Sequence, residues 1–140
     1  MNHAIIRHGF ILILFALVSG LFVPLMEIPR LGLSAHTIGV LSGVLLIAVG
    51  AVWQQFSLSV RQSQVMVWSW LYSSYVNWLG CLVGAIFGAG KSTPVASAGA
   101  LGSPAAENAV AFMLISVGVV SFVAVGLSLW GLRSRAASTA

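Results

Sequence analysis

The chain has 140 residues, of which 59% are hydrophobic and only 6% are charged, whereas soluble domains carry about 25% charged residues. Six basic and two acidic side chains cannot cover the surface of a soluble protein of this length, but the same composition suits helices that face lipid. The composition therefore excludes an ordinary soluble domain and predicts an integral membrane protein. The net charge of +4 predicts no nucleic-acid partner, because the basic residues are spread along the chain at the ends of apolar runs.

Four apolar runs predict four transmembrane helices, at about 9–26, 34–56, 63–88 and 108–132. A helix needs roughly 20 residues to cross the hydrocarbon core of a bilayer, and each run is long enough. Pro24 and Pro29 predict the first turn, and Ser34 is the expected N-cap of the second helix. We therefore expect an all-α fold, a membrane four-helix bundle that forms a single domain over residues 1–140.

The segment 91–107 is rich in Ser, Gly, Ala and Pro, which predicts an external loop and not a second domain. The sequence GAGKST at 88–93 resembles the end of a phosphate-binding loop. The full pattern needs a glycine where Ala85 stands, and the segment follows a membrane helix instead of a strand. We therefore predict no nucleotide site. The single cysteine, Cys81, excludes an internal disulfide.

The distribution of basic residues predicts the orientation of the chain. With four spans both termini lie on one side, and that side carries four basic residues, whereas the other side carries two. Basic residues are enriched in cytoplasmic loops. We therefore expect both termini in the cytoplasm and the protein in the inner (cytoplasmic) membrane.

His36 lies about one turn inside the second predicted helix, on a helical face that continues through Gly39 and Gly43. A histidine beside a glycine groove can hold a haem iron from one side, with the flat ring against the groove. The alternative is an interfacial histidine bonded to water or a carbonyl group, with glycines that only pack helices. Arg30, six residues earlier, is either a topology charge or a partner for an acidic ligand group.

Asn77 lies near the middle of the third predicted helix. Polar side chains at this depth usually face the interior of a helix bundle. With Tyr75 close by and Ser42 on the second helix, it predicts a small polar pocket in an apolar surround, the usual form of a small-molecule site. The alternative is a hydrogen bond from Asn77 that only joins two helices.

Five blocks of the sequence resemble hydroxylaminobenzene mutase, in the same order and at similar spacing. The blocks are RHGF at 7–10, PRLGLSAH at 29–36, LS at 58–59, YVNW at 75–78 and GAG at 88–90. The resemblance covers the chain from Arg7 to about Arg133, and the block that ends in Ala35 and His36 is its most specific part. The chain resembles styrene oxide isomerase more distantly, through the alanine-histidine pair of the second helix and the asparagine of the third.

The resemblance to the mutases implies rearrangement of hydroxylaminobenzene, a small aromatic hydroxylamine, to 2-aminophenol. The hydroxyl group moves within the molecule from nitrogen to the ortho ring carbon. This involves no net redox change, so neither NAD nor a flavin is implied. The resemblance to styrene oxide isomerase implies haem b on His36, a homotrimer, and ferric iron that acts as a Lewis acid on the substrate oxygen.

These implications select the candidate site residues. The candidates for holding the cofactor are His36, as axial ligand of the haem iron, with Gly39, Gly43 and Arg30. The candidates for catalysis are Asn77, Tyr75 and Ser42.

The sequence departs from the pattern of its relatives at two positions. Both families tend to have asparagine six residues after the histidine, where this chain has Ser42, and the tyrosine of styrene oxide isomerase falls on Cys81. Epoxide isomerisation is therefore the second interpretation. A small transporter or an assembly subunit remains a third, although the only carboxylate of the first helix, Glu27, lies at its end and not at membrane depth.

Overall fold

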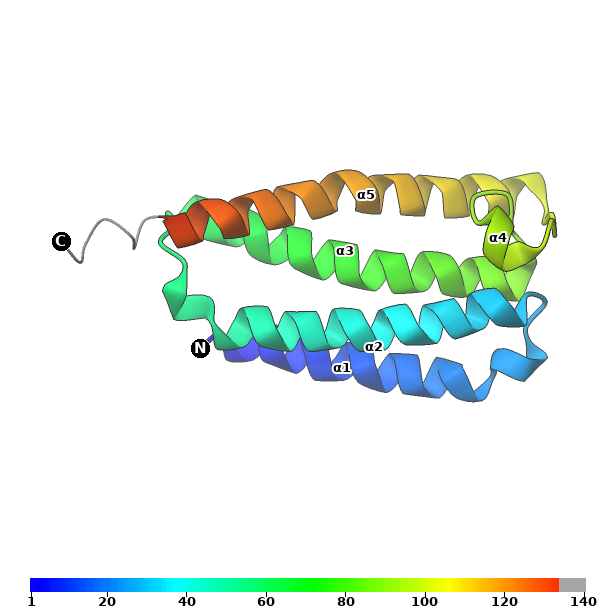
Figure 1. Cartoon of the computed structure of the whole chain (residues 1–140), viewed down its shortest axis with the longest axis horizontal. Coiled ribbons are helices and arrows are strands. Elements are labelled where there is room, and N and C mark those ends of the chain that lie inside the picture. Colours follow the sequence, from blue (N-terminus) through cyan, green and yellow to red (C-terminus); the bar gives the residue numbers. More distant parts are fainter. Residues whose placement is uncertain (134–140) are drawn as a thin grey trace.

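Figure 1 shows the computed structural model, which describes residues 1–133. Four long helices make up most of the fold: α1 (His3–Leu21), α2 (Pro29–Ala51), α3 (Val60–Phe87) and α5 (Pro104–Leu132). The shorter elements are the 3-10 turns η1 (Val23–Leu25) and η2 (Trp53–Gln55) and the single-turn helix α4 (Pro94–Ser97). Residues 1–133 contain no strand, so the prediction of an all-α fold is confirmed.

Local sequence determines where the helices begin and end. At the start of α3, Ser59 accepts a hydrogen bond from the main-chain N–H of Gln62 (3.3 Å), and the Gln62 side chain accepts one from the N–H of Ser59 (3.0 Å). The hydroxyl of Ser103 likewise accepts from the N–H of Ala106 (3.3 Å) at the start of α5. These bonds satisfy N–H groups that have no partner inside the helix. The α3 helix ends at Gly88, whose φ of 67° favours glycine.

Several predicted boundaries were wrong by a few residues. The first helix spans His3–Leu21 and not 9–26, because Pro24 lies in the separate turn η1. The second helix begins at Pro29, which suits a first helical position because proline has no N–H to leave unpaired. Ser34 is therefore not its N-cap; it lies inside α2, and its hydroxyl donates to the main-chain oxygen of Arg30 (3.1 Å). The last helix begins four residues early, at Pro104, which shortens the predicted loop.

The four long helices form an open row in which neighbours in the chain pack on one another. α1 packs on α2, α2 on α3 and α3 on α5, the order seen from bottom to top in Figure 1. α1 also contacts α3, for example where His8 meets Tyr75 and Phe15 meets Trp78, whereas α5 packs extensively on α3 alone. An open row leaves α5 without a second neighbouring helix and leaves faces of the row uncovered within the described chain.

The exposed faces are apolar. Phe112, Ile115 and Phe122 of α5 have exposed fractions of 72%, 69% and 83%. Such a surface is stable in lipid and not in water. By length and composition α1, α2 and α5 are each able to cross a membrane, and the chain is a membrane protein. The α3 helix is long enough at 28 residues but is less apolar than the other three, and it is not among the candidate spans.

Glycines bring α1 and α2 into close contact. A Cβ atom on Gly9 would lie 2.6 Å from the main-chain oxygen of Gly43, and a Cβ atom on Gly43 would lie 2.7 Å from that of Gly9. No larger residue permits this approach without a shift of the backbone. Small residues serve this purpose in membranes, where helices gain no hydrophobic energy by associating.

A buried carboxylate organises the segment between α3 and α5. Glu107, in the first turn of α5, accepts hydrogen bonds from the main-chain N–H groups of Gly90 (3.1 Å), Lys91 (3.0 Å) and Gly102 (2.9 Å). Three bonds to one carboxylate satisfy a charge that would otherwise be costly to bury. The loop predicted at 91–107 is therefore folded back onto the start of α5.

Candidate functional site

His36 lies in the interface between α1 and α2. Its Nδ1 atom is 2.8 Å from the main-chain oxygen of Ala16, and the ring packs against Gly20. A Cβ atom on Gly20 would lie 2.5 Å from Nδ1, so the ring occupies the space that the missing side chain leaves. The α1 helix thus holds the imidazole by one hydrogen bond and one close packing contact.

This hydrogen bond determines the tautomer of His36. A carbonyl oxygen only accepts, so Nδ1 carries the proton and donates it to Ala16. In the neutral ring the lone pair is then on Nε2, and within residues 1–133 the hydrogen bonds of His36 involve Nδ1 alone. Metal-bound histidines usually donate their second ring N–H to a carbonyl or carboxylate in this way. The arrangement therefore fits a histidine that would hold a haem iron through Nε2.

Gly39 and Gly43 have neighbours that leave no room for a flat ring. A Cβ atom on Gly39 would lie 2.6 Å from that of Ala16 and 2.7 Å from Cδ1 of Trp78, while Gly43 faces Ile13 and Gly9 of α1. Of the two interpretations that the sequence left open, these contacts favour helix packing.

Arg30 lies apart from His36. It is exposed in the first turn of α2 and lies beside a shallow hollow formed with α4. Six residues of helix separate it from His36, which places the two about 120° apart around the α2 axis. The structure therefore does not bring the guanidinium and the imidazole together on one face.

The structure also does not bring the three catalytic candidates, Tyr75, Asn77 and Ser42, into one hydrogen-bonded group. The hydroxyl of Tyr75 donates to the main-chain oxygen of His8 (3.1 Å) and lies 3.2 Å from its Nδ1 atom, with the two rings edge to face. Asn77 and Ser42 are partly buried, and their side chains make no hydrogen bond within residues 1–133. Tyr75 is thus engaged with α1, whereas Asn77 and Ser42 are not tied to another helix by a side-chain hydrogen bond within residues 1–133.

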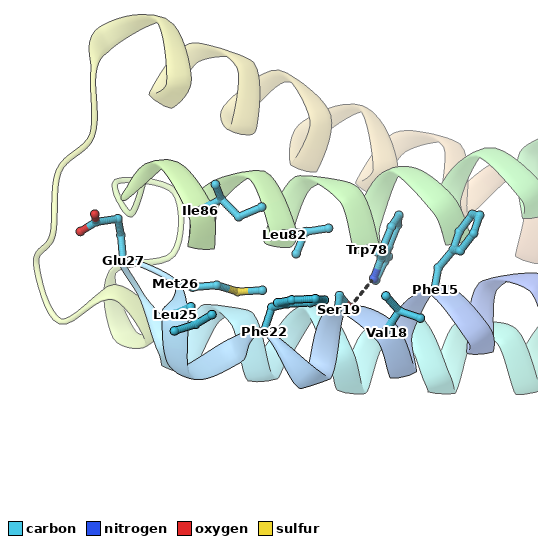
Figure 2. Close-up of a pocket in the computed structure, with 10 residues that line it drawn as sticks. All are labelled: Phe15, Val18, Ser19, Phe22, Leu25, Met26, Glu27, Trp78, Leu82 and Ile86. Carbon is cyan, nitrogen blue, oxygen red and sulfur yellow. Dashed lines mark hydrogen bonds between the residues drawn. The ribbon is translucent and has the colours of Figure 1, made fainter.

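A cleft opens beside the α1 residues that hold His36. It has a volume of about 480 Å³ and lies between the end of α1, the turn η1 and the second half of α3 (Figure 2). Its lining residues are Phe15, Val18, Ser19, Phe22, Leu25, Met26, Glu27, Trp78, Leu82 and Ile86. His36 is not one of them.

Ser19 links this cleft to His36. Its hydroxyl donates to the main-chain oxygen of Ala16 (3.0 Å), the same oxygen that accepts from His36, and it accepts a long hydrogen bond from Nε1 of Trp78 (3.4 Å). Ala16, Ser19 and Gly20 were not among the candidate residues predicted from the sequence. The spacing of Ala16 and Gly20 by four residues, with both small, is the signal that marks this face of α1 as a packing face.

Comparison with known proteins decides the family. The profile of the family described as styrene oxide isomerase matches residues 1–133. The chain belongs to the styrene oxide isomerase family. Membership in a family of isomerases decides against the transporter and assembly-subunit interpretations, and the protein is an isomerase.

Two curated relatives cover nearly the whole chain. The hydroxylaminobenzene mutase HabB of Ectopseudomonas oleovorans is 40% identical over 134 residues, which are 95% of this chain and 82% of the relative. The hydroxylaminobenzene mutase HabA of the same organism is 35% identical over 125 residues, or 89% of this chain and 93% of the relative. No solved structure matches the chain significantly. The resemblance inferred from the five sequence blocks is confirmed.

Proposed function

We propose that the protein isomerises hydroxylaminobenzene to 2-aminophenol by moving the hydroxyl group from nitrogen to the ortho carbon within one molecule. The observation that carries this proposal is the 40% identity to a hydroxylaminobenzene mutase over 95% of the chain. The second mutase, at 35% identity over 89% of the chain, supports the same substrate class.

We propose that all four long helices cross the inner membrane, with both termini in the cytoplasm. The α3 helix packs between α2 and α5, both of which are apolar enough to span, and its 28 residues exceed the roughly 20 that a span requires. The excess of basic residues on the side of the termini supports this orientation. Reporter fusions after Leu132 and within 91–102 test it: the first should report a cytoplasmic location and the second an external one.

We propose that His36 holds haem b through Nε2. Support comes from the hydrogen bond between Nδ1 and the main-chain oxygen of Ala16, which leaves Nε2 as the ring nitrogen that could bind a metal. When bound there, the iron would supply a Lewis acid for the hydroxylamine oxygen. Gly39 and Gly43, whose open sides are filled by residues of α1 and by Trp78, would not take part in holding the haem.

The chain's own residues would orient the substrate and exclude water. Asn77 and Ser42 offer an amide and a hydroxyl that make no side-chain hydrogen bond within residues 1–133, and in an apolar surround such groups interact strongly with developing charge. We assign them to hold the migrating hydroxyl group near the ortho carbon. The apolar helices keep bulk water from the ring, which prevents attack at other positions. Tyr75 would act through its pair with His8, since its hydroxyl is already bonded there.

We propose that the site is completed in a homo-oligomer, with a trimer favoured by the resemblance to styrene oxide isomerase. His36 faces α1, whereas Ser42 lies about 120° from it around α2 and Asn77 is on α3. One copy of the open row therefore does not gather these side chains. The mass of the purified protein in detergent, measured by light scattering, tests the trimer.

The first experiment combines an absorption spectrum of the purified protein with product analysis after hydroxylaminobenzene is added. We expect a Soret band, 2-aminophenol as product, and loss of both in His36→Ala but not in His3→Ala, which changes an exposed histidine. Normal 2-aminophenol without a Soret band would overturn the haem proposal alone. Absence of 2-aminophenol from protein that carries haem would overturn the mutase proposal.

Epoxide isomerisation is the second candidate, because the family profile that matches residues 1–133 is that of styrene oxide isomerase. The same preparation tests it with styrene oxide as substrate. We expect a much higher kcat/KM for hydroxylaminobenzene, and a reversed preference would make epoxide isomerisation the principal activity.

A further inference from the structure

The cleft between α1, η1 and α3 has the dimensions of a small-molecule site. Its volume of about 480 Å³ lies within the range of roughly 300–1,000 Å³ that is typical of ligand pockets. Apart from Ser19, Glu27 and the indole N–H of Trp78, its lining residues are apolar. The cleft therefore suits a ligand that is mostly hydrocarbon.

Aromatic side chains shape its inner end. The rings of Phe15 and Trp78 are stacked with their centroids 5.7 Å apart and their planes at 25°. Figure 2 shows Phe22 extending along the cleft between Leu25 and Ser19. Aromatic walls favour a flat ring, because offset and edge-to-face contacts add to the energy of burial.

Ser19 determines which polar group the ligand should carry. Its hydroxyl proton is donated to the main-chain oxygen of Ala16, so Oγ is not available as a donor. Oγ has two lone pairs, of which the long bond from Nε1 of Trp78 uses one. The other lone pair has no donor within residues 1–133, and because Ser19 lines the cleft, it suits a ligand with an N–H or O–H donor.

Glu27 does not change this selection. It lies at the mouth of the cleft, and Figure 2 shows its carboxylate directed away from the other lining side chains. No cationic side chain lines the cleft within residues 1–133, so nothing there would balance a carboxylate or phosphate of the ligand.

We propose that this cleft is a second binding site, separate from His36, for a small aromatic ring with an N–H donor, that is, an arylamine or arylhydroxylamine. The ring would lie between Phe22 and Trp78, and its N–H would donate to Oγ of Ser19. The identification of the natural ligand as substrate or product rests on the proposed function, but binding of an arylamine does not.

Aniline is the test probe, because it has the ring and the N–H donor but no hydroxyl group to move. Its binding to the full chain in lipid nanodiscs is measured by equilibrium dialysis, with toluene as the ligand that lacks the donor. Val18→Trp fills the cleft, and Val125→Trp on α5 is the matched control, since the two valines have exposed fractions of 48% and 44%. Ser19→Ala removes the acceptor.

We expect saturable binding of aniline to the wild type and to Val125→Trp, and loss of saturable binding in Val18→Trp. Ser19→Ala should weaken aniline about three- to tenfold, as for the loss of one hydrogen bond, and leave toluene unchanged. Equal binding of aniline by Val18→Trp and wild type would overturn the proposal. So would toluene binding as tightly as aniline, which would indicate an apolar groove for lipid chains.

These outcomes are separable from those of the proposed function. Wild-type protein that binds aniline in this pattern but forms no 2-aminophenol would leave the cleft as an arylamine site and overturn the mutase proposal. Protein that forms 2-aminophenol while Val18→Trp leaves aniline binding unchanged would overturn the cleft and leave the mutase proposal standing.

Discussion

His36 and Ala16 are joined across the α1–α2 interface by a hydrogen bond of 2.8 Å from imidazole Nδ1 to the main-chain oxygen. Because a main-chain acceptor cannot be removed by a side-chain substitution, the orientation of His36 depends on how closely α1 approaches α2. Gly20 permits that approach, since the imidazole ring occupies the space beside its Cα atom.

Gly20→Ala should displace the imidazole of His36. The added Cβ atom would lie 2.5 Å from Nδ1, so the ring must move or the helices must separate. We expect reduced haem content and at least about tenfold lower activity, in line with the cost of disturbing the second partner of a metal-bound histidine. Haem is measured as the Soret absorbance per protein.

Gly126→Ala is the control, because a Cβ atom on Gly126 would meet nothing within 4 Å. Replacing a helical glycine at an open position should stabilise the protein by about 0.5–1 kcal/mol. Equal haem content and activity in Gly20→Ala and Gly126→Ala would contradict the role given to Gly20.

Gly43→Val should separate α1 from α2. Its Cβ atom would lie 2.5 Å from Cγ1 of Ile13 and 2.7 Å from the main-chain oxygen of Gly9, and a backbone atom cannot move aside without shifting the helix. We expect a loss of stability of about 1–3 kcal/mol, the usual cost of overpacking, measured by thermal unfolding in detergent. Gly118→Val on α5 should be tolerated, since nothing lies within 4 Å of its added Cβ, and an equal loss there would refute this explanation.

Glu107→Gln should loosen the segment between α3 and α5. One carboxylate oxygen accepts from Gly90 and Gly102, and the other accepts from Lys91. The amide group of the substituted side chain would direct a donor at one of these N–H groups. We expect a loss of about 1–3 kcal/mol, together with faster proteolysis within 90–102. Glu27→Gln changes an exposed carboxylate and should leave proteolysis as in the wild type.

Asn77→Leu should lower activity without lowering stability. The Asn77 amide makes no hydrogen bond within residues 1–133, so its replacement breaks none there. If the amide holds the migrating hydroxyl group, kcat should fall by about 100-fold, as when one donor to developing charge is removed. Asn108→Leu changes an exposed asparagine and should retain activity. A large drop in the unfolding temperature of Asn77→Leu with kcat retained would instead assign Asn77 to helix packing.

The sequence placed His36 better than it placed Tyr75, and the arrangement of the helices explains the difference. The pattern PRLGLSAH placed His36 near the start of the second helix and indicated the family of the chain, because such a motif depends only on neighbouring residues. Tyr75 was predicted to share a pocket with Asn77 because the two are close in sequence. Residues two positions apart on a helix, however, point to nearly opposite sides. The hydroxyl of Tyr75 instead meets His8, 67 residues away.

The sequence by itself determined the membrane class, the all-α fold and the family. Composition decides between lipid and water as the surrounding solvent, helical spans follow from backbone hydrogen bonds that must be satisfied within each segment, and motifs persist among relatives. Only the tertiary structure decided the open row of helices, the tautomer of His36, the cleft beside Ser19 and the burial of Glu107. Each of these depends on which helix faces pack together, and that choice is made by contacts between residues far apart in the chain, such as Gly9 with Gly43 and Ala16 with His36.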